Sequence, residues 1–298
     1  MRKIITRIIA WTVCIALISV GLYFLCAVYG NPVSSALAQS TAKKHLQETY
    51  SGTDFEIERI GYDLKTGGYY AKVMSPSSQD SYFTIYTDGL GRFKYDTFHR
   101  IADGTNTFTR LNDEYWSLVK SALPPDHLNT DMHFGELRTT GLFEIFDYVN
   151  EDGQRIYYTL TKDYGLDVTD LVLDGEYDIH QLGRDHGSIH VNIYDRNVTV
   201  ERAAELLLEI KTYLDDQDIP FHAIDFDLYE PRNADGQLMG DSISLDDFLY
   251  SDIYEEGLTD RVAEAWNITQ EHHAIQDALK KEAELLIPYF IELPEDVN

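Results

Sequence analysis

An uninterrupted apolar run near the N-terminus constrains the fold of this chain more than any other feature. Residues 8–28 read IIAWTVCIALISVGLYFLCAV and contain neither a charged residue nor a proline. A bilayer core of about 30 Å needs about 20 apolar residues in a helix, and a helix satisfies its own backbone hydrogen bonds in lipid. The run therefore predicts one transmembrane helix whose partner is the lipid bilayer.

The charges that flank this run predict its orientation. Arg2, Lys3 and Arg7 precede it, and the next basic residue is Lys43. Basic residues favour the cytoplasmic side of a membrane. We therefore expect a cytoplasmic N-terminus, a single crossing and an extracytoplasmic body.

A cleaved signal peptide is the alternative interpretation of the same run. Ala36, Leu37 and Ala38 form an A-x-A cleavage pattern. The run is longer than the roughly 7–15 apolar residues of a signal peptide, which favours a retained anchor. The only cysteines, Cys14 and Cys26, lie inside the run, so the body has no disulfide and depends on its core.

Charge limits the partners that the body can have. The chain has 298 residues, and 51 acidic against 24 basic residues give a net charge of −27. Such a body repels phosphate backbones and anionic lipid heads, so nucleic acid is excluded as a partner. Cations or a cationic protein surface would suit it, and so would a role in solubility alone.

The first half of the body predicts a small α+β domain over residues 32–125. A helix over residues 33–50 is followed by a meander of strands, with a bulge in the first strand and a turn at Gly67-Gly68. We expect a polar loop over residues 75–80 and a second helix over residues 106–122. Alternating apolar residues place the strands at residues 55–64, 69–74, 81–87 and 91–96.

The second half predicts another α+β domain, over residues 126–298. Its clearest unit is a strand, a helix capped by Thr199 and a second strand, which we expect to be parallel. The chain is thus predicted as α+β: a cytoplasmic tip and anchor over residues 1–31, then two domains. The predicted elements are a hairpin of residues 142–149 and 155–161, strands 187–195 and 221–229, helix 199–217, loop 231–241, a short helix 245–250, and a long helix 257–287 that a break near Asn267 could divide.

Four segments of the chain resemble the YfjL-like family of Gram-positive bacteria. They are GNPVS at residues 30–34, KKHLQETY at 43–50, VERAAE at 200–205 and DFLYSDIYEEG at 247–257. The resemblance spans nearly the whole chain and implies a membrane-anchored, exported protein. It carries over no activity, cofactor or catalytic residue. The small helix-plus-meander domain is also similar to exported regulatory modules of the PepSY and cystatin-like kind.

Two short motifs evoke penicillin-binding enzymes. Ser40 and Lys43 fit S-x-x-K, and residues 65–67 fit K-T-G. Those motifs normally lie far apart with an S-D-N between them, whereas here they are some twenty residues apart without one. We therefore expect residues 65–67 to form only a hairpin tip.

Histidines are the candidate metal ligands of the second half. His180, His186 and His190 lie near Asp178 and Asp185, but the spacing matches no zinc motif and residues 182–187 are expected to form a loop. The pair His272-His273 precedes Asp277 on the last predicted helix, where such pairs more often stabilise a helix surface. We expect exposed or hydrogen-bonded histidines and no metal or cofactor.

Carboxylates are the other candidate site. Asp225 and Asp227 share one face of a predicted strand, near Asp235, Asp241, Asp246 and Asp247. Such a group could bind Ca²⁺ irregularly or hydrolyse a glycoside. The segment from Asn233 to Gly236 imitates part of an EF-hand loop but lacks the terminal glutamate. A solvated acidic edge is the expected outcome.

Tyrosine is abundant, with 21 residues, and Tyr69, Tyr70, Tyr82 and Tyr86 cluster on the first meander. Tyrosines favour half-buried sheets and also binding surfaces. We therefore expect a non-enzymatic binding or regulatory module at the outer face of the membrane, with an envelope or membrane protein as a possible partner. A cell-envelope hydrolase that uses the carboxylates or histidines, and a Ca²⁺-stabilised structural module, remain the alternatives.

Overall fold

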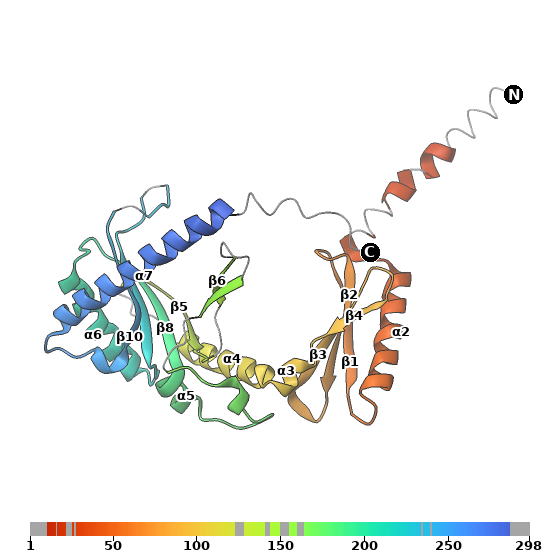
Figure 1. The fold of residues 1–298 in the computed structure, drawn as a ribbon, viewed down its shortest axis with the longest axis horizontal. Helices are drawn as coiled ribbons and strands as arrows, with labels where there is room; N and C mark the ends of the chain where they lie inside the picture. The colour runs from red at the N-terminus through yellow and green to blue at the C-terminus, as the bar shows by residue number, and fades with distance from the viewer. Residues whose placement is uncertain are drawn as a thin grey trace. The chain divides into compact units, whose positions relative to one another are not determined.

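The computed structural model divides the chain into two compact units (Figure 1). It describes residues 11–15, 17–21, 26, 28–122, 128–140, 144–149, 155–159, 164–233, 235–238 and 240–286. Unit 1 comprises Met1–Thr107 and Leu171–Gly175, and unit 2 comprises Phe108–Asp170 and Glu176–Asn298. The division falls between Thr107 and Phe108, whereas the predicted boundary at residue 125 lies outside the described residues.

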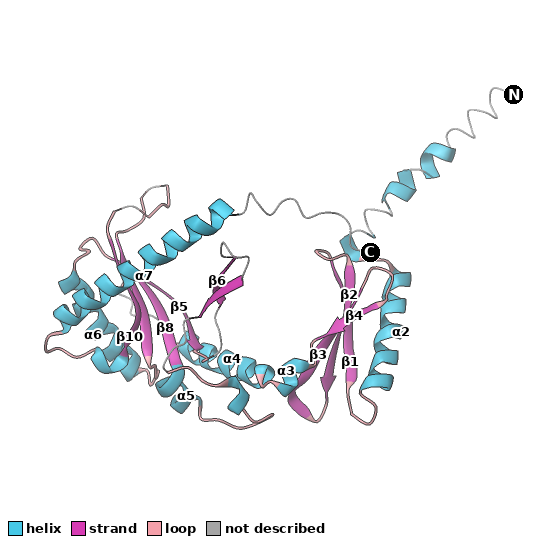
Figure 2. Cartoon of the chain, viewed as in Figure 1, coloured by secondary structure: helices cyan, strands magenta, loops and turns pink. Residues whose placement is uncertain are grey.

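Unit 1 is a helix packed on a four-stranded antiparallel meander, as its periodicity predicts (Figure 2). The predicted loop over residues 75–80 is wrong, because β2 and β3 are joined by a turn of only Pro76 and Ser77. The register shift between Ile57 and Arg59 confirms the predicted bulge. The elements are α2 (Pro32–Thr49), β1 (Glu56–Asp63), β2 (Gly68–Ser75), β3 (Ser78–Thr87) and β4 (Phe93–Asp96), in the sheet order β1-β2-β3-β4.

Helix α2 covers one face of this sheet. Its fully buried Ala42 belongs to a core formed with Ala71, Val73, Phe83 and Ile85 from β2 and β3. These strand residues alternate along their strands, so they all face the helix. The opposite face of the sheet carries the residues between them.

Side-chain hydrogen bonds hold the N-terminus and the middle of α2. The Asn31 side chain caps the N-terminus by accepting a hydrogen bond from the backbone N–H of Val33 at 2.8 Å. The Tyr69 hydroxyl donates to the carbonyl of Asn31 at 3.0 Å. Further along the helix, the Thr41 hydroxyl donates to the carbonyl of Gly91 at 2.6 Å.

A distant segment completes unit 1. The carboxylates of Asp80 and Asp174 each accept a hydrogen bond from the other residue's backbone N–H, at 2.9 and 3.1 Å. The Asn106 amide donates to the carbonyls of Asp80 and Tyr82. These bonds explain why Leu171–Gly175 belongs to unit 1. Helix α3 (His99–Ala102) also belongs to unit 1, whereas helix α4 (Thr105–Ser121) begins in unit 1 and belongs to unit 2 from Phe108 onward.

Unit 2 is built on a mixed sheet in the order β10-β9-β8-β5. Strands β8 and β9 are parallel and are joined by helix α6, which confirms the predicted strand–helix–strand unit. A separate hairpin pairs β6 with β7, again as predicted. The strands are β5 (Thr130–Leu137), β6 (Glu144–Val149), β7 (Arg155–Thr159), β8 (Gly187–Tyr194), β9 (Ala223–Tyr229) and β10 (Ser242–Leu249).

The core of unit 2 lies between α6 (Val200–Asp216) and one face of this sheet. Thr199 caps α6, and its hydroxyl accepts from the backbone N–H of Arg202 at 3.2 Å. The buried sheet residues alternate along β8 and β9, whereas the other face carries polar residues. The fully buried side chains here include Leu206, Leu207, Leu214, Ile189, Ile193, Ile224, Phe226 and Leu228.

Two predictions for unit 2 are wrong, and one of its strands was missed. The predicted helix over residues 245–250 is the end of strand β10, where a bulge lies between Leu245 and Phe248. The predicted loop over residues 182–187 is mostly helix α5 (Ile179–His186), which Asp178 caps. Strand β5 was not predicted at all.

The last helix and the N-terminus complete the described chain. Helix α7 (Leu258–Leu286) runs through Asn267 without a break, and short 3-10 turns occupy Val168–Asp170 and Tyr250–Asp252. Among the residues that the structure describes, no helix has both the length and the apolar character needed for a membrane crossing.

Candidate functional site

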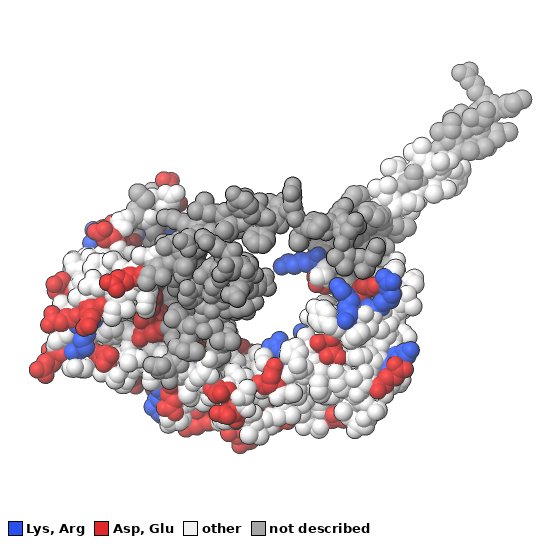
Figure 3. Space-filling view, in the orientation of Figure 1, with Lys and Arg blue, Asp and Glu red and all other residues white. Residues whose placement is uncertain are grey.

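The net negative charge of the chain comes from unit 2. Unit 1 contains 11 Lys and Arg against 10 Asp and Glu, whereas unit 2 contains 13 against 41. Figure 3 shows carboxylates gathered over the described surface of unit 2. The acidic character that the composition predicts for the whole body therefore belongs to one unit only.

Arg138 lies at the centre of a polar cluster that joins strands of the unit 2 sheet. Its Nη2 donates to Asp225 Oδ2 at 2.6 Å and to Ser188 Oγ at 3.3 Å. Its Nη1 donates to the carboxylate of Glu136. These partners belong to β5, β8 and β9, so one guanidinium links three strands of the sheet.

Asp247 connects the fourth strand to this cluster. Its backbone N–H donates to Asp225 Oδ1 at 2.8 Å, and its carboxylate accepts from the Tyr164 hydroxyl. Asp247 Oδ1 also lies 3.7 Å from Arg138 Nη2. The residue has a φ of +52° within the β10 bulge, a conformation that side chains other than glycine, Asn and Asp adopt rarely. We call Arg138, Tyr164, Asp225 and Asp247 the arginine cluster.

Electrostatics keep the arginine cluster paired. Burial by itself would lower the pKa of Arg138, but the Asp225 and Glu136 carboxylates outweigh it and raise that pKa. Burial also raises the pKa of Tyr164, which Arg138 partly opposes. Asp225 thus accepts two hydrogen bonds as the counter-ion of Arg138, whereas a general acid or nucleophile has to be available to a substrate.

Sequence reasoning singled out Asp225 and Asp247 but missed Arg138 and Tyr164. Arg138 is the only Lys or Arg between Lys120 and Arg155. A lone basic residue in an acidic stretch was the available signal.

The predicted histidines do not converge. His186, at the end of α5, has its Nδ1 2.6 Å from the carbonyl of Tyr164. His190, on β8, has its Nε2 3.5 Å from Asp227 Oδ2, and His180 pairs loosely with exposed Asp218. Within the described part of the chain, no three His, Cys, Asp or Glu side chains form a group that could hold a metal ion.

The other predicted carboxylates and the last histidine pair are also separated. Asp235 and Asp241 are exposed in the loop before β10, whereas Asp246 pairs with His273 at 3.3 Å. The side chain of Asp277 lies outside the described residues. Asp227 shares its strand face with Asp225, as predicted. The remaining part of the EF-hand-like segment is a tight turn, in which Asn233 accepts from the backbone N–H groups of Asp235 and Gln237.

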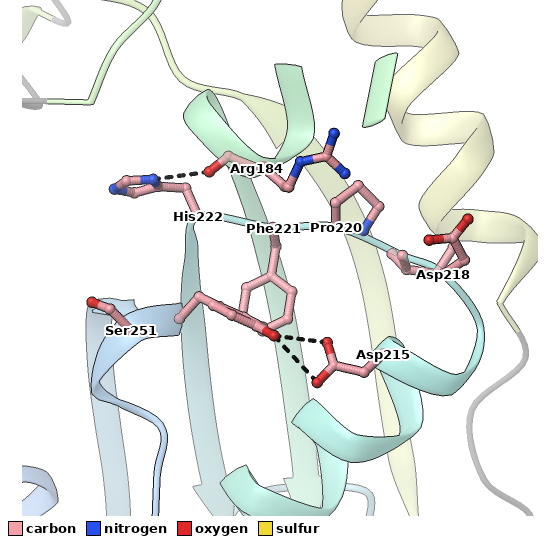
Figure 4. A pocket seen from close by; sticks show the side chains of 9 residues that line it. Arg184, Asp215, Asp218, Pro220, Phe221, His222 and Ser251 are labelled. Atoms are coloured by element: carbon pink, nitrogen blue, oxygen red, sulfur yellow. Dashed lines mark hydrogen bonds between the residues drawn. The ribbon is translucent and has the colours of Figure 1, made fainter. Parts of the chain in front are cut away.

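An open hollow of about 340 Å³ lies where α6 ends and β9 begins (Figure 4). His222 points its ring toward the carbonyl of Arg184, and Asp215 accepts a hydrogen bond from Tyr250. The hollow adjoins the first residue of the parallel strand β9, whereas ligands of open α/β sheets bind at the carboxyl ends of parallel strands. Its position therefore gives no support to an active site.

The S-x-x-K and K-T-G motifs are structural. Ser40 and Lys43 are exposed on α2. Residues 65–67 belong to the turn between β1 and β2, where the Thr66 hydroxyl donates to Asp63 Oδ2 at 2.8 Å. The predicted hairpin tip is confirmed.

The open face of the unit 1 sheet carries a row of exposed and half-buried tyrosines. Strand pairing places Tyr70 beside Tyr86 and Tyr86 beside Tyr95. The rings of Tyr86 and Tyr95 stack with centroids 4.7 Å apart. The predicted tyrosine group is therefore divided, because Tyr69 is buried on the α2 side. We call this surface the tyrosine face and define it by Arg59, Tyr70, Lys72, Tyr82, Tyr86 and Tyr95.

Comparison with known proteins identifies the family of this chain. The model of the YfjL-like N-terminal domain matches residues 5–97, and the model of the YfjL-like C-terminal domain matches residues 139–263. No curated protein and no solved structure matches the chain. Together the two domain models cover most of the sequence, in the order and at the places that the resemblance in residues 30–34 and 247–257 predicts. The chain therefore belongs to the YfjL-like family.

Proposed function

We propose that this protein is a membrane-anchored, non-enzymatic binding or regulatory module at the outer face of the cell membrane. The observation that carries the proposal is a contrast between its polar and aromatic groups. The candidate catalytic carboxylate Asp225 is held by Arg138, whereas the tyrosine face is open. A surface that offers aromatic rings without an available nucleophile or base favours binding over hydrolysis.

The retained anchor is supported by the way α2 is built into unit 1. A cut at residues 36–38 would divide α2 and remove Asn31, which caps that helix and bonds to Tyr69. It would also remove Ala38, a buried residue of α2 that is only 2% exposed. Because the apolar run of residues 8–28 directly precedes this structure, retention of the run as an anchor agrees with an intact unit 1.

Cysteine labelling tests the location and the orientation. The only cysteines are Cys14 and Cys26, so a Cys14→Ala, Cys26→Ala background carries no thiol. In this background we expect Ser51→Cys, on an exposed turn, to react with a membrane-impermeant maleimide in intact cells. A cysteine in a tag before Met1 should react only after lysis. Equal labelling of both positions in intact cells, or a tagged product that lacks the first 38 residues, would contradict the anchor.

Proximity labelling of the full chain at its natural level tests the binding role. A labelling enzyme fused at the C-terminus should mark a small, reproducible set of extracytoplasmic or membrane proteins. The control is the same enzyme fused to residues 1–31 alone, which share the proposed anchor but not the body. Identical protein sets for both fusions would contradict a binding role of the body.

A further inference from the structure

The tyrosine face is flat because glycine lies beneath its first ring. Tyr70 is paired with Gly61 of β1, and a Cβ at position 61 would overlap the Tyr70 ring. The ring can therefore lie down across the sheet, in the manner of an aromatic side chain that covers a strand glycine. A shallow hollow of about 300 Å³ beside it is lined by Tyr70, Lys72, Thr84 and Tyr86, among others.

Tyr70 and Tyr86 at the centre of this face are half-buried, and the side chains around them are exposed. The side chains of Tyr82, Met74 and Tyr95 are 36%, 41% and 52% exposed. Tyrosine, methionine and arginine are enriched in the cores of protein–protein interfaces. A rigid sheet loses little entropy when such side chains bind a partner.

The charges at the centre of the tyrosine face are basic, whereas Glu56 and Asp63 lie on the same side of the sheet at the two ends of β1. Arg59 and Lys72 are paired across β1 and β2, and neither forms an ion pair with a residue that the structure describes. The Arg59 guanidinium carbon lies 5.8 Å from the Tyr70 ring centroid, so this cation is positioned by the aromatic surface. Unpaired cations at the centre of an aromatic face favour an anionic partner.

We propose that the tyrosine face binds an acidic surface of another protein. This inference rests on the proposed binding function and names its surface and the chemistry of its partner. A membrane surface fits less well, because anionic lipids select clusters of about 4–8 basic residues. The tyrosine face has two, and the carboxylates of Glu56 and Asp63 on the same side of the sheet would be repelled by a uniformly anionic lipid surface.

Photo-cross-linking of the full chain in its own cells tests this proposal. Met74→p-benzoylphenylalanine places the probe at the rim of the tyrosine face, and Tyr254→p-benzoylphenylalanine places it on unit 2. We expect a discrete adduct from position 74 with one protein, through a peptide of net negative charge. The double substitution Arg59→Glu, Lys72→Glu should lower the yield of this adduct at least about tenfold. It replaces the two cations with carboxylates, which an acidic partner surface repels.

A matched variant controls for the change in net charge. Lys43→Glu with Lys44→Glu reverses the same number of charges on the exposed surface of α2, on the other side of the sheet, and should leave the yield unchanged. Gly61→Val displaces the Tyr70 ring without any charge change and should also lower the yield. Hydrogen exchange of β2 and β3 confirms that each variant remains folded.

The remaining outcomes separate this proposal from the proposed function. Two outcomes overturn the acidic-partner proposal. One is an adduct with lipid or with a second copy of this chain, and the other is a protein adduct whose yield does not change in the Arg59→Glu, Lys72→Glu variant. An adduct from position 254 without one from position 74 overturns the tyrosine face but leaves the binding module standing. The absence of adducts from both positions contradicts both proposals.

Discussion

At the scale of single residues, Arg138 joins strands of the unit 2 sheet. Its guanidinium is bound to carboxylates on β5 and β9, the two strands that flank β8, and its Nε is buried without a hydrogen-bond partner among the described residues. A buried ion pair adds little net stability, but removal of one partner leaves an uncompensated charge. Arg138 therefore aligns one end of the sheet and at the same time holds the Asp225 carboxylate in an ion pair.

Arg138→Met should destabilise unit 2 by about 3 kcal/mol, because Asp225 and Asp247 would lose their counter-ion. Denaturant unfolding followed by tryptophan fluorescence measures this, since Trp116 and Trp266 both belong to unit 2. Arg184→Met is the control: that side chain is exposed, and the expected change is within about 0.5 kcal/mol. Equal effects of the two substitutions would show that the arginine cluster has no structural role.

Asp96 predicts how unit 1 responds to acid. Burial would raise its pKa, but hydrogen bonds from His45, from the backbone of Phe98 and from the Tyr50 hydroxyl lower it. A lowered folded-state pKa gives stability that is present above the unfolded-state value of about 3.9 and is lost as pH falls through the folded-state value.

Asp96→Asn should therefore reduce the hydrogen-exchange protection of α2 at neutral pH by about tenfold, because a hydrogen bond to a charged group contributes about 1.5–3 kcal/mol. The difference in α2 protection between this variant and the original chain should become smaller as the pH falls below about 4. Glu48→Gln, at an exposed position on the same helix, is the control. A difference that stays constant down to pH 2 would contradict a role for the carboxylate charge.

At the scale of elements, the packing of α4 against the sheet and helix α5 of unit 2 depends on three glycines. Tyr115 is fully buried, and its hydroxyl donates to the carbonyl of Pro220 at 2.9 Å. A Cβ at Gly135, Gly183 or Gly187 would meet this ring at 3.0 Å or less. The close approach of β5, α5 and β8 to one aromatic ring explains why glycine occupies all three positions.

Gly187→Ala should destabilise unit 2 by about 2 kcal/mol, since overpacking of a filled core typically costs about 1–3 kcal/mol. Thermal unfolding by tryptophan fluorescence is the measurement. Tyr115→Phe removes only the hydroxyl and should cost about 1 kcal/mol. In the Gly187→Ala, Tyr115→Leu double variant the two effects should be less than additive, because the smaller side chain relieves the contact. Full additivity would mean that Tyr115 and Gly187 do not interact.

At the scale of the whole molecule, charge divides the chain into a balanced unit and a strongly acidic one. Self-repulsion among 41 acidic residues opposes the folding of unit 2, whereas unit 1 is nearly neutral. The proposed acidic partner of the tyrosine face agrees with this division, because Arg59 and Lys72 lie in the unit whose nearly balanced charge would not repel such a partner.

Salt should therefore stabilise unit 2 more than unit 1. An increase of NaCl from about 0.1 M to about 1 M shortens the Debye length from about 10 Å to about 3 Å. Hydrogen exchange read by mass spectrometry follows the two units separately in one sample, so unit 1 is the internal control. An equal increase of hydrogen-exchange protection in both units would show that the general effect of salt on apolar burial outweighs the screening of charge repulsion.

Divalent cations test the Ca²⁺-stabilised alternative. A site that binds Ca²⁺ only in the folded state raises the unfolding temperature with Ca²⁺ concentration. We expect CaCl₂ and MgCl₂ at equal ionic strength to have the same effect on unit 2, since screening does not distinguish them. A larger effect of CaCl₂ would instead identify a Ca²⁺ site.

The sequence by itself determined the elements whose pattern is local. Helices α2, α4 and α6 and strands β1, β2 and β9 lie within a few residues of their predicted ranges, because the apolar residues repeat with the period of the element itself. The parallel pairing of β8 with β9 also followed from chain order, since a helix separates the two strands.

Only the tertiary structure decided the register and the partners. Leu245 and Phe248 are three residues apart, as on a helix, because the β10 bulge adds a residue between them. Arg138 and Asp225 are 87 positions apart, and no periodicity connects them. Strand β5 pairs with β8 over separations from 50 positions, for Leu137 and Gly187, to 63 positions, for Thr130 and Ile193. Local sequence fixes which backbone conformation is favourable, whereas burial and pairing between distant segments decide which strand it joins and whether a carboxylate is free or bound.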